Sequence, residues 1–317
     1  MMHGRFTTPA HEIESTRLFD CACAVGESPT WDADTTSLWW VDAAGKALLR
    51  GSLRDGSIAR YVLPLSPSFI AAITKDAVLF AADRGWYALS LSGESLTLLA
   101  EPENGPSEQW RMNDGVVDFQ GRIWTGSIGL PRGDQSLGAL YRWDADGVHI
   151  LADDLLTQNG LAISPDGRTL YLADSHPSRA VIWAFDLEPI DGTLSDKRVF
   201  HTVQTGRPDG AAIDCEGGYW VALIDAGTVV RLNATGTITH RVTVPVSRPT
   251  NVCFGGDGMR QAFVTSMRAG LDDDALERQP DAGTVFTFEA PFPGLAQPVP
   301  NVPSTLWPSD AMPANSI

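Results

Sequence analysis

The chain has 317 residues, of which 39 are acidic and 23 basic, for a net charge of −16 at pH 7. That negative charge repels phosphate backbones and anionic membrane surfaces, so a nucleic-acid or membrane partner is not expected. The length alone would allow two domains, but closed all-β architectures of this size often form one. Ten tryptophans and 30 glycines favour short strands joined by tight turns.

Residues 1–13 carry no strand pattern and are expected to form a loose N-terminal tail. The first 20 residues lack the apolar run of a secretory signal, and no stretch approaches the roughly 18 apolar residues of a membrane helix. The cysteines form no CxxC pair and are interpreted as reduced packing residues, which favours a cytoplasmic setting. They are Cys21, Cys23, Cys215 and Cys253.

A sequence pattern then repeats along the chain: a polar residue, a short apolar strand, a tight turn and a second apolar strand. Two clear copies begin at Asn159-Gly160 and Asp209-Gly210. Aligned on their first polar residue, the six copies begin at Glu27, Ser68, Asn113, Asn159, Asp209 and Thr250. A period of roughly 40–50 residues with several short strands per unit is typical of a propeller blade. The sequence therefore predicts an all-β, six-bladed β-propeller with four-stranded blades.

The propeller is expected to span residues 14–290. Its blades are expected at about 27–65, 68–100, 113–152, 159–203, 209–244 and 250–288. The last repeat has no outer strand after Gly283–Phe288, whereas Thr16–Ala24 is strand-like without a local partner. We therefore expect Thr16–Ala24 to complete blade six, which joins the two chain ends and removes an open sheet edge.

Two further segments have open interpretations. Leu130–Leu137 is a longer insertion in blade three, and it is either a lid over the channel mouth or a solvated connector. Residues 291–317 carry seven prolines and cannot lie inside a sheet. This C-terminal tail is therefore either a wrapping arm or disordered.

The aligned polar residues are related by rotation about the propeller axis, so we expect them to meet at one mouth of the channel. Glu27, Asn159 and Asp209 would then supply two carboxylates and one amide oxygen, which suits a hard divalent cation. Oxygen ligands allow Ca, Mg, Mn, Fe or Zn. The alternative is that Asn159-Gly160 and Asp209-Gly210 are only turns, because both dipeptides are common there.

Two observations favour the metal site over the turns. Each of these copies has its own hairpin turn a few residues later, and Glu27 has no turn role. Carboxylates buried together without a cation would also repel each other. Asp114 and Asp118 are instead interpreted as turn and strand-end residues.

Arg111 precedes Asn113 by two residues, so on an extended strand both side chains could face the axis. Arg111 could bind a polar substrate or neutralise the carboxylates, and the alternative is a structural ion pair. The sequence has no glycine-rich phosphate loop, no GxSxG nucleophile elbow and no HExxH motif. That pattern disfavours nucleotide binding and serine hydrolysis and leaves metal-assisted chemistry.

Four motifs in this order resemble the SMP-30/gluconolactonase/luciferin-regenerating enzyme family, over about residues 18–290. They are Gly26–Trp31, Arg111–Gly115, Gln158–Leu161 and Arg207–Gly210. The resemblance implies a six-bladed propeller with one divalent metal ion, bound by Glu27, Asn159 and Asp209. It also implies that Arg111 and Asn113 contact the substrate.

The resulting hypothesis is a metal-dependent lactonase that opens a gluconolactone-type sugar-acid lactone to the aldonic acid. The metal would polarise the lactone carbonyl, and Asp209 would act as general base toward the attacking water. One alternative is a metal-dependent esterase or phosphotriesterase on the same site. Another is a propeller that binds calcium or a metabolite without turnover. We expect a small-molecule sugar lactone as the partner, and a monomer or small homo-oligomer.

Overall fold

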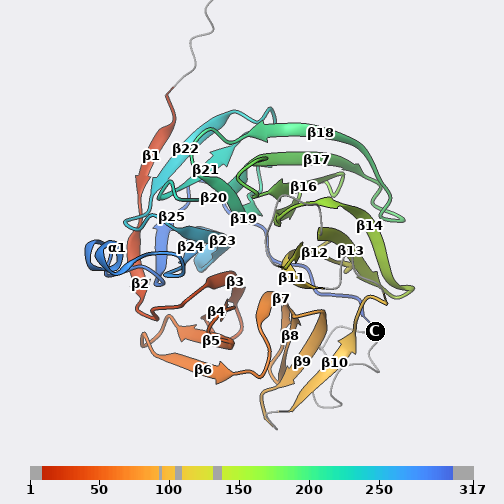
Figure 1. Cartoon of the computed structure of the whole chain (residues 1–317), viewed down its shortest axis with the longest axis horizontal. Coiled ribbons are helices and arrows are strands. Elements are labelled where there is room, and N and C mark those ends of the chain that lie inside the picture. Colours follow the sequence, from red (N-terminus) through yellow and green to blue (C-terminus); the bar gives the residue numbers. More distant parts are fainter. Residues whose placement is uncertain (1–8, 93–94, 104–108, 131–137, 303–317) are drawn as a thin grey trace, which may run out of the picture.

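The computed structural model describes residues 9–92, 95–103, 109–130 and 138–302. Six β-sheets are arranged in a ring about a central channel, as Figure 1 shows. Within the described residues the helical elements are the short η1 (Asp257–Met259) and α1 (Asp273–Arg278). The predicted six-bladed β-propeller is therefore confirmed. The described part of the chain has no helix that is long and apolar enough to cross a membrane.

Each blade begins with the strand nearest the channel and proceeds outward. Blades one to three are β3 (Gly26–Asp32), β4 (Ser37–Asp42), β5 (Ala47–Ser52) and β6 (Ile58–Val62); β7 (Pro67–Ile73), β8 (Ala77–Ala82), β9 (Gly85–Ser90) and β10 (Leu96–Ala100); and β11 (Trp110–Val117), β12 (Ile123–Gly129), β13 (Gly138–Asp144) and β14 (Gly147–Leu155). Blades four to six are β15 (Gln158–Ile163), β16 (Thr169–Asp174), β17 (Val181–Leu187) and β18 (Leu194–Thr202); β19 (Arg207–Ile213), β20 (Tyr219–Ile224), β21 (Thr228–Leu232) and β22 (Ile238–Thr243); and β23 (Pro249–Gly255), β24 (Gln261–Ser266), β25 (Val285–Glu289) and β2 (Thr16–Phe19).

The N-terminal strand β2 closes the ring, as the sequence predicted. It pairs antiparallel with β25, with Thr16 opposite Thr287 and Phe19 opposite Val285. The strand is shorter than the expected Thr16–Ala24, because regular pairing ends at Phe19. The outer edge of blade six is therefore covered by the start of the chain.

The segment before β2 corrects the expectation of a loose tail over residues 1–13. His11–Glu14 form β1, which pairs parallel with β22 and adds a fifth strand to the sheet of blade five. Its side chains are mostly exposed, so no apolar alternation marks it in the sequence. The strand is held by main-chain pairing to an edge, and such pairing does not require a side-chain pattern.

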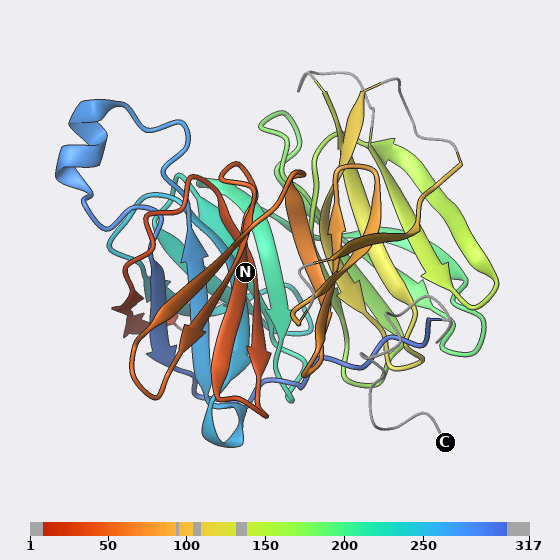
Figure 2. The same cartoon turned by 90° about the horizontal axis from the view of Figure 1, so that it is seen from below.

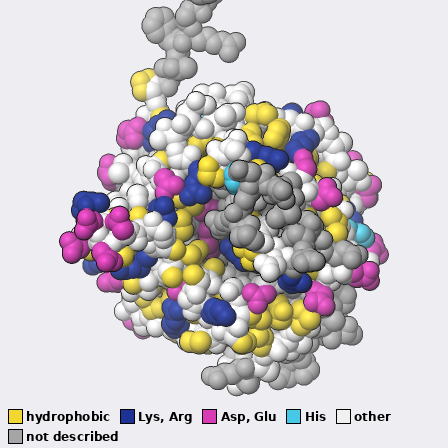
Figure 3. All heavy atoms as spheres, viewed as in Figure 1, with side chains coloured by type: hydrophobic (Ala, Val, Ile, Leu, Met, Phe, Trp, Pro, Cys, Tyr) yellow, Lys and Arg dark blue, Asp and Glu magenta, His cyan; other side chains and the backbone are white. Residues whose placement is uncertain are grey.

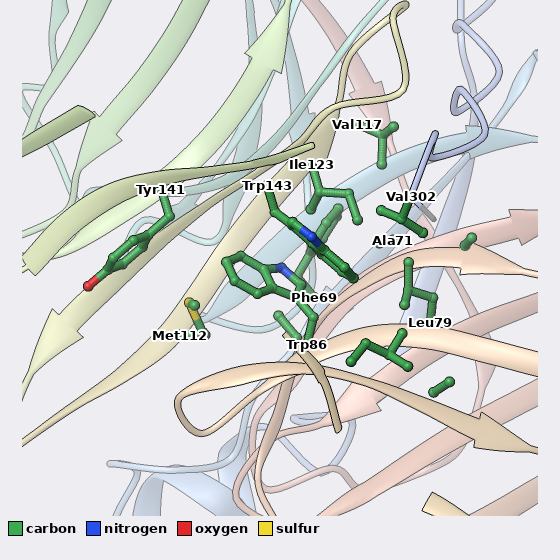
Figure 4. Close-up of a cluster of buried hydrophobic side chains, with 14 of the residues drawn as sticks. Phe69, Ala71, Leu79, Trp86, Met112, Val117, Ile123, Tyr141, Trp143 and Val302 are labelled. Atoms are coloured by element: carbon green, nitrogen blue, oxygen red, sulfur yellow. The ribbon is translucent and has the colours of Figure 1, made fainter. Parts of the chain in front are cut away.

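The core lies between the blades, where the apolar faces of adjacent sheets meet. Figure 4 shows one such cluster, in which Trp86 of blade two and Trp143 of blade three have ring centroids 5.3 Å apart. The indole nitrogen of the buried Trp86 donates to Thr125 Oγ1 at 3.1 Å, so its polar atom is satisfied. Val302 of the C-terminal segment packs into the same cluster.

The described part of the C-terminal tail wraps the propeller. Residues 291–302 run along one end of the ring in Figure 2. The side-chain amide of Gln297 donates to the carbonyls of Ile70 and Ala71, and the amide of Asn301 donates to the carbonyl of Gly121. For this stretch the structure supports the wrapping arm. Residues 303–317 lie outside the described residues, as do 131–137 of the blade-three insertion.

The four cysteines are free thiols, as expected, but they do not all pack in the interior. Cys23 is buried, whereas Cys215 is exposed at the turn between β19 and β20. The interpretation of Cys215 as a packing residue is therefore wrong. Cys215 lies at the surface because it belongs to the hairpin turn that ends at Gly218.

Candidate active site

A cavity of about 440 Å³ lies at one end of the channel and is lined by residues from all six blades. Such a volume suits a small-molecule ligand. The cavity contains all five side chains that the sequence singled out: Glu27, Arg111, Asn113, Asn159 and Asp209. Figure 3 shows acidic side chains in the hollow at the centre of this face.

An irregularity in each innermost strand orients these side chains. The innermost strand of every blade shifts its register at the aligned polar residue, here called the ring position. The shifts lie between Glu27 and Thr30, Pro67 and Phe69, Met112 and Gly115, Asn159 and Ala162, Pro208 and Ala211, and Pro249 and Asn251. A β-bulge places an extra residue on one strand and redirects its side chain. The Asn-Gly and Asp-Gly pairs therefore lie inside strands, and the alternative that they are turns is wrong.

Glu27 is in an unfavourable electrostatic environment. Burial raises the pKa of its carboxyl well above the usual value, and the nearby charges of Asp209 and Asp114 raise it further. The side-chain amide of Asn251 donates to Glu27 Oε2 at 3.3 Å and offsets only part of this effect. A bound cation would stabilise the ionised form of carboxylates that lie this close together, because its attraction offsets their mutual repulsion.

The side-chain amide of Asn159, which lines the cavity, is oriented by hydrogen bonds at both of its ends. The hydroxyl of Ser175 donates to the carbonyl oxygen of Pro208, so Ser175 Oγ accepts from the Asn159 amide nitrogen, at 2.8 Å. The opposite atom, Asn159 Oδ1, accepts from Asn113 Nδ2 at 2.7 Å. This chain of hydrogen bonds fixes which end of the amide faces the cavity.

Asp209 lies in β19, is only 3% exposed as a residue and lines the floor of the cavity. The next residue, Gly210, must be a glycine, because a Cβ there would collide with the side-chain amide of Asn251. Asn251 in turn approaches both Glu27 and Asp114. Gly210 therefore permits the close packing of blades five and six beneath the acidic side chains.

Asp114 corrects the interpretation of a turn residue. It lies within β11 and is buried, and its Oδ2 accepts from the backbone amide of Leu161 at 2.9 Å. Burial raises the pKa of its carboxyl to about 6. Asp118, in contrast, follows the end of β11 and accepts from the turn amides of Gln120 and Arg122, as expected of a strand-end residue.

The ring position of blade six also differs from the expectation. Thr250 is fully buried and its hydroxyl donates to the carbonyl of Gly26, so it ties blade six to blade one. The next residue, Asn251, directs its amide toward the carboxylates instead. The sequence contained a signal for Asp114, because Asn113-Asp114-Gly115 has one more residue before its glycine than Asn159-Gly160 and Asp209-Gly210. Alignment on the glycine would have placed Asp114 opposite Asn159 and Asp209.

The donor set at the floor fits a hard divalent cation. Among the described residues no three His, Cys, Asp or Glu side chains form a metal-binding group. A cation beside Glu27 and Asp209 could take the Asn159 amide oxygen as a third protein ligand, since all three side chains line the same cavity. The hydrogen bond from the Asn159 amide nitrogen to Ser175 leaves the amide oxygen as the ligand atom.

Comparison with known proteins agrees with this architecture. Residues 25–268 match the family model described as the SMP-30/Gluconolactonase/LRE-like region. The chain belongs to this family. It is 35% identical over 276 residues to a 6-deoxy-6-sulfogluconolactonase of Pseudomonas putida, which covers 87% of this chain and 94% of the relative.

Other members of the SMP-30/gluconolactonase family are similar over comparable lengths. Regucalcin of Oryctolagus cuniculus is 32% identical over 283 residues, covering 87% of this chain and 93% of the relative. The crystal structure of a regucalcin from Agrobacterium tumefaciens, described as a calcium-binding protein, superposes with a TM-score of 0.85 at 29% identity. That alignment covers 92% of this chain and 99% of the other. The family resemblance inferred from the four motifs is therefore confirmed.

Proposed function

We propose that this protein is a metal-dependent lactonase that hydrolyses a sugar-acid lactone to the aldonic acid. One observation carries the proposal: Glu27, Asn159 and Asp209 place two carboxylates and an oriented amide oxygen at the floor of one buried cavity. The name of the Pseudomonas putida relative supports a sugar lactone as the substrate class. The name of the Agrobacterium tumefaciens structure supports a divalent metal, with calcium among the candidates beside Zn, Mn, Mg and Fe.

Glu27, Asn159 and Asp209 would hold the cation. A divalent cation bound there supplies Lewis acidity that polarises the lactone carbonyl. Asp209 acts as general base: its carboxylate accepts a proton from the water that attacks the carbonyl carbon. The bond from that carbon to the ring oxygen then breaks, and the released alkoxide takes up the proton to give a hydroxyl.

Arg111 and Asn113 position the substrate. Both line the cavity, and Arg111 Nη1 is braced by the carbonyl oxygen of Met112 at 2.9 Å. Asn113 Nδ2 donates to the carbonyl of Gln158 at 2.6 Å as well as to Asn159, so both amide hydrogens are used and the amide oxygen is the atom that would accept from a substrate hydroxyl. These two side chains would fix the lactone ring over the floor.

A second candidate function is supported by the calcium-binding description of the regucalcin structure: a propeller that binds a cation or metabolite without turnover. A third is hydrolysis of other esters or of phosphotriesters at the same site. A pH-stat assay on the metal-loaded protein separates the three, with glucono-lactone, a simple aryl ester and an aryl phosphotriester as substrates. The proposal predicts preferential, Asp209-dependent lactone opening. Binding without turnover, or a preference for the ester or phosphotriester, would contradict it.

A further inference from the structure

A second ring of side chains lies one step nearer the mouth than the acidic floor. The residues two positions before the aligned ring also line the cavity: Val25, Ser66, Arg111, Thr157, Arg207 and Arg248. Alternate residues of an extended strand face the same side and are about 7 Å apart. The site therefore has an acidic inner ring and an outer ring in which three of the six residues are arginines.

Two of these arginines come from adjacent blades and share one carboxylate. Arg207 begins β19 of blade five, and its Nη2 lies 3.0 Å from Asp225 Oδ2. Arg248 directly precedes β23 of blade six, and its Nε lies 2.9 Å from Asp225 Oδ1. Asp225 itself lies in the turn between β20 and β21, at the same end of the propeller.

The charges in this group do not balance. One carboxylate neutralises one guanidinium, so the Arg207–Asp225–Arg248 group keeps one positive charge. Among the residues that the structure describes, neither arginine forms an ion pair with another carboxylate. A single arginine would suffice to join the two blades through Asp225, and the remaining positive charge attracts a negatively charged group of a ligand in the cavity.

The pair is also held in place. The side chains of Arg207 and Arg248 are only 24% and 20% exposed. Arg248 Nη1 donates to the carbonyl of Ala269 at 2.6 Å, and a Cβ at Gly270 would collide with the same nitrogen. Gly270 has a φ of +78°, which glycine adopts without strain, so the loop leaves room for the guanidinium. Two guanidinium groups fixed in this way lose little entropy when they bind an oxyanion.

We propose that Arg207 and Arg248 form an anion subsite, and that the substrate is a lactone with an anionic group at the end farthest from its carbonyl. This inference rests on the proposed lactonase function and specifies its substrate. The carbonyl must lie at the floor, because the proposed base and metal ligands are there. Because the arginines and the acidic side chains line the same cavity and begin two strand residues apart, one small lactone can contact both groups at once. A sulfonate or phosphate offers oxygens to both guanidinium groups, as paired arginines require.

The test compares kcat/KM for three lactones on the metal-loaded full chain: glucono-lactone and its 6-sulfo and 6-phospho counterparts. We expect the wild type to prefer an anionic lactone, and the better of the two shows which anion the subsite favours. In Arg207→Gln and in Arg248→Gln, the ratio of anionic to neutral kcat/KM should fall by about 10- to 100-fold, mainly through KM. Arg207→Lys should fall less, because it keeps the charge and loses the planar fork.

Arg198→Gln is the matched control. Arg198 bridges two carboxylates, Asp186 and Asp196, on the exposed outer part of blade four and lies outside the cavity. It should leave the ratio unchanged. If Arg207→Gln and Arg248→Gln lower the melting temperature but not the ratio, the group is only a clasp and the inference is wrong. If the wild type opens glucono-lactone but gains nothing from either anion, the anion subsite fails while the lactonase stands. If no lactone is opened, the proposed function itself fails.

Discussion

Asn113 and Asn159 are joined by a 2.7 Å hydrogen bond from Nδ2 of the first to Oδ1 of the second, across the boundary of blades three and four. The acceptor is the atom that we propose as a metal ligand, and the donor belongs to the residue that we propose as a substrate contact. An amide oxygen has two lone pairs, so Asn159 can accept from Asn113 and still coordinate a cation. Substrate and metal sites are therefore linked by a single hydrogen bond.

Ser175 is predicted to control metal affinity without touching the metal. Its hydroxyl accepts from Asn159 Nδ2 and so keeps the amide oxygen toward the cavity. Ser175→Ala removes this constraint, and the metal dissociation constant should rise by about 10- to 100-fold. Calorimetric titration of the metal-free protein measures it. Ser195→Ala, on the exposed strand β18, is the control. Equal affinities in the two variants would contradict the orienting role.

Asp209 combines two proposed roles that substitution can separate. Asp209→Ala removes a ligand and the base, so turnover should be abolished and metal affinity should fall. Asp209→Asn keeps an oxygen ligand but cannot accept the proton, so part of the metal affinity should remain while kcat falls by about 100- to 10,000-fold. Single-turnover rates and metal content are measured on the same samples. A wild-type rate in Asp209→Asn would exclude Asp209 as the base.

Removing the metal should affect activity more than folding. The hydrophobic core is distributed over clusters between all six blades, so the site is a small part of the total stability. Added metal should still stabilise the folded state by mass action and so raise the melting temperature. At a metal concentration of 100 times the dissociation constant, the free energy of unfolding should increase by about 2.7 kcal/mol. Differential scanning calorimetry with increasing metal checks this. An unfolded metal-free protein would show that the site organises the fold.

N-terminal truncation tests how the ring is closed. A chain starting at residue 11 keeps both β1 and β2 and should match the full protein. A chain starting at residue 16 loses β1, exposes the edge of β22 and should melt at a modestly lower temperature. A chain starting at residue 25 also loses β2, uncovers β25 and should aggregate or melt much lower. If the last of these is soluble with an unchanged melting temperature, closure by β2 is not needed for stability.

Most of the fold could be predicted from the sequence repeat alone. Six aligned copies imply rotational symmetry, and symmetry turns positions far apart in the sequence into neighbours around one axis. This is why Glu27 and Asp209 could be placed together without any structure. The missing outer strand after Gly283–Phe288 likewise indicated that the N-terminus closes the ring.

The features that the sequence did not predict have physical causes that a pattern of polar and apolar residues does not show. β1 is held by main-chain pairing and buries little, so it has no signature in the sequence. Asp114 is not a turn residue, because the register shift between Met112 and Gly115 places it in a bulge within β11. In blade six the register shift ends at Asn251, so this residue, and not Thr250, turns toward the carboxylates.

The proposed reaction requires one metal ion in this cavity to open a lactone. The most direct test is to titrate chelator-stripped protein with a divalent metal while the hydrolysis of the preferred lactone is followed in a pH-stat. Metal-dependent hydrolysis predicts negligible enzymatic turnover without metal, and a rate that rises and saturates at one equivalent per chain. Full activity in the stripped protein, or a rate that does not respond to any of the candidate metals, would contradict it.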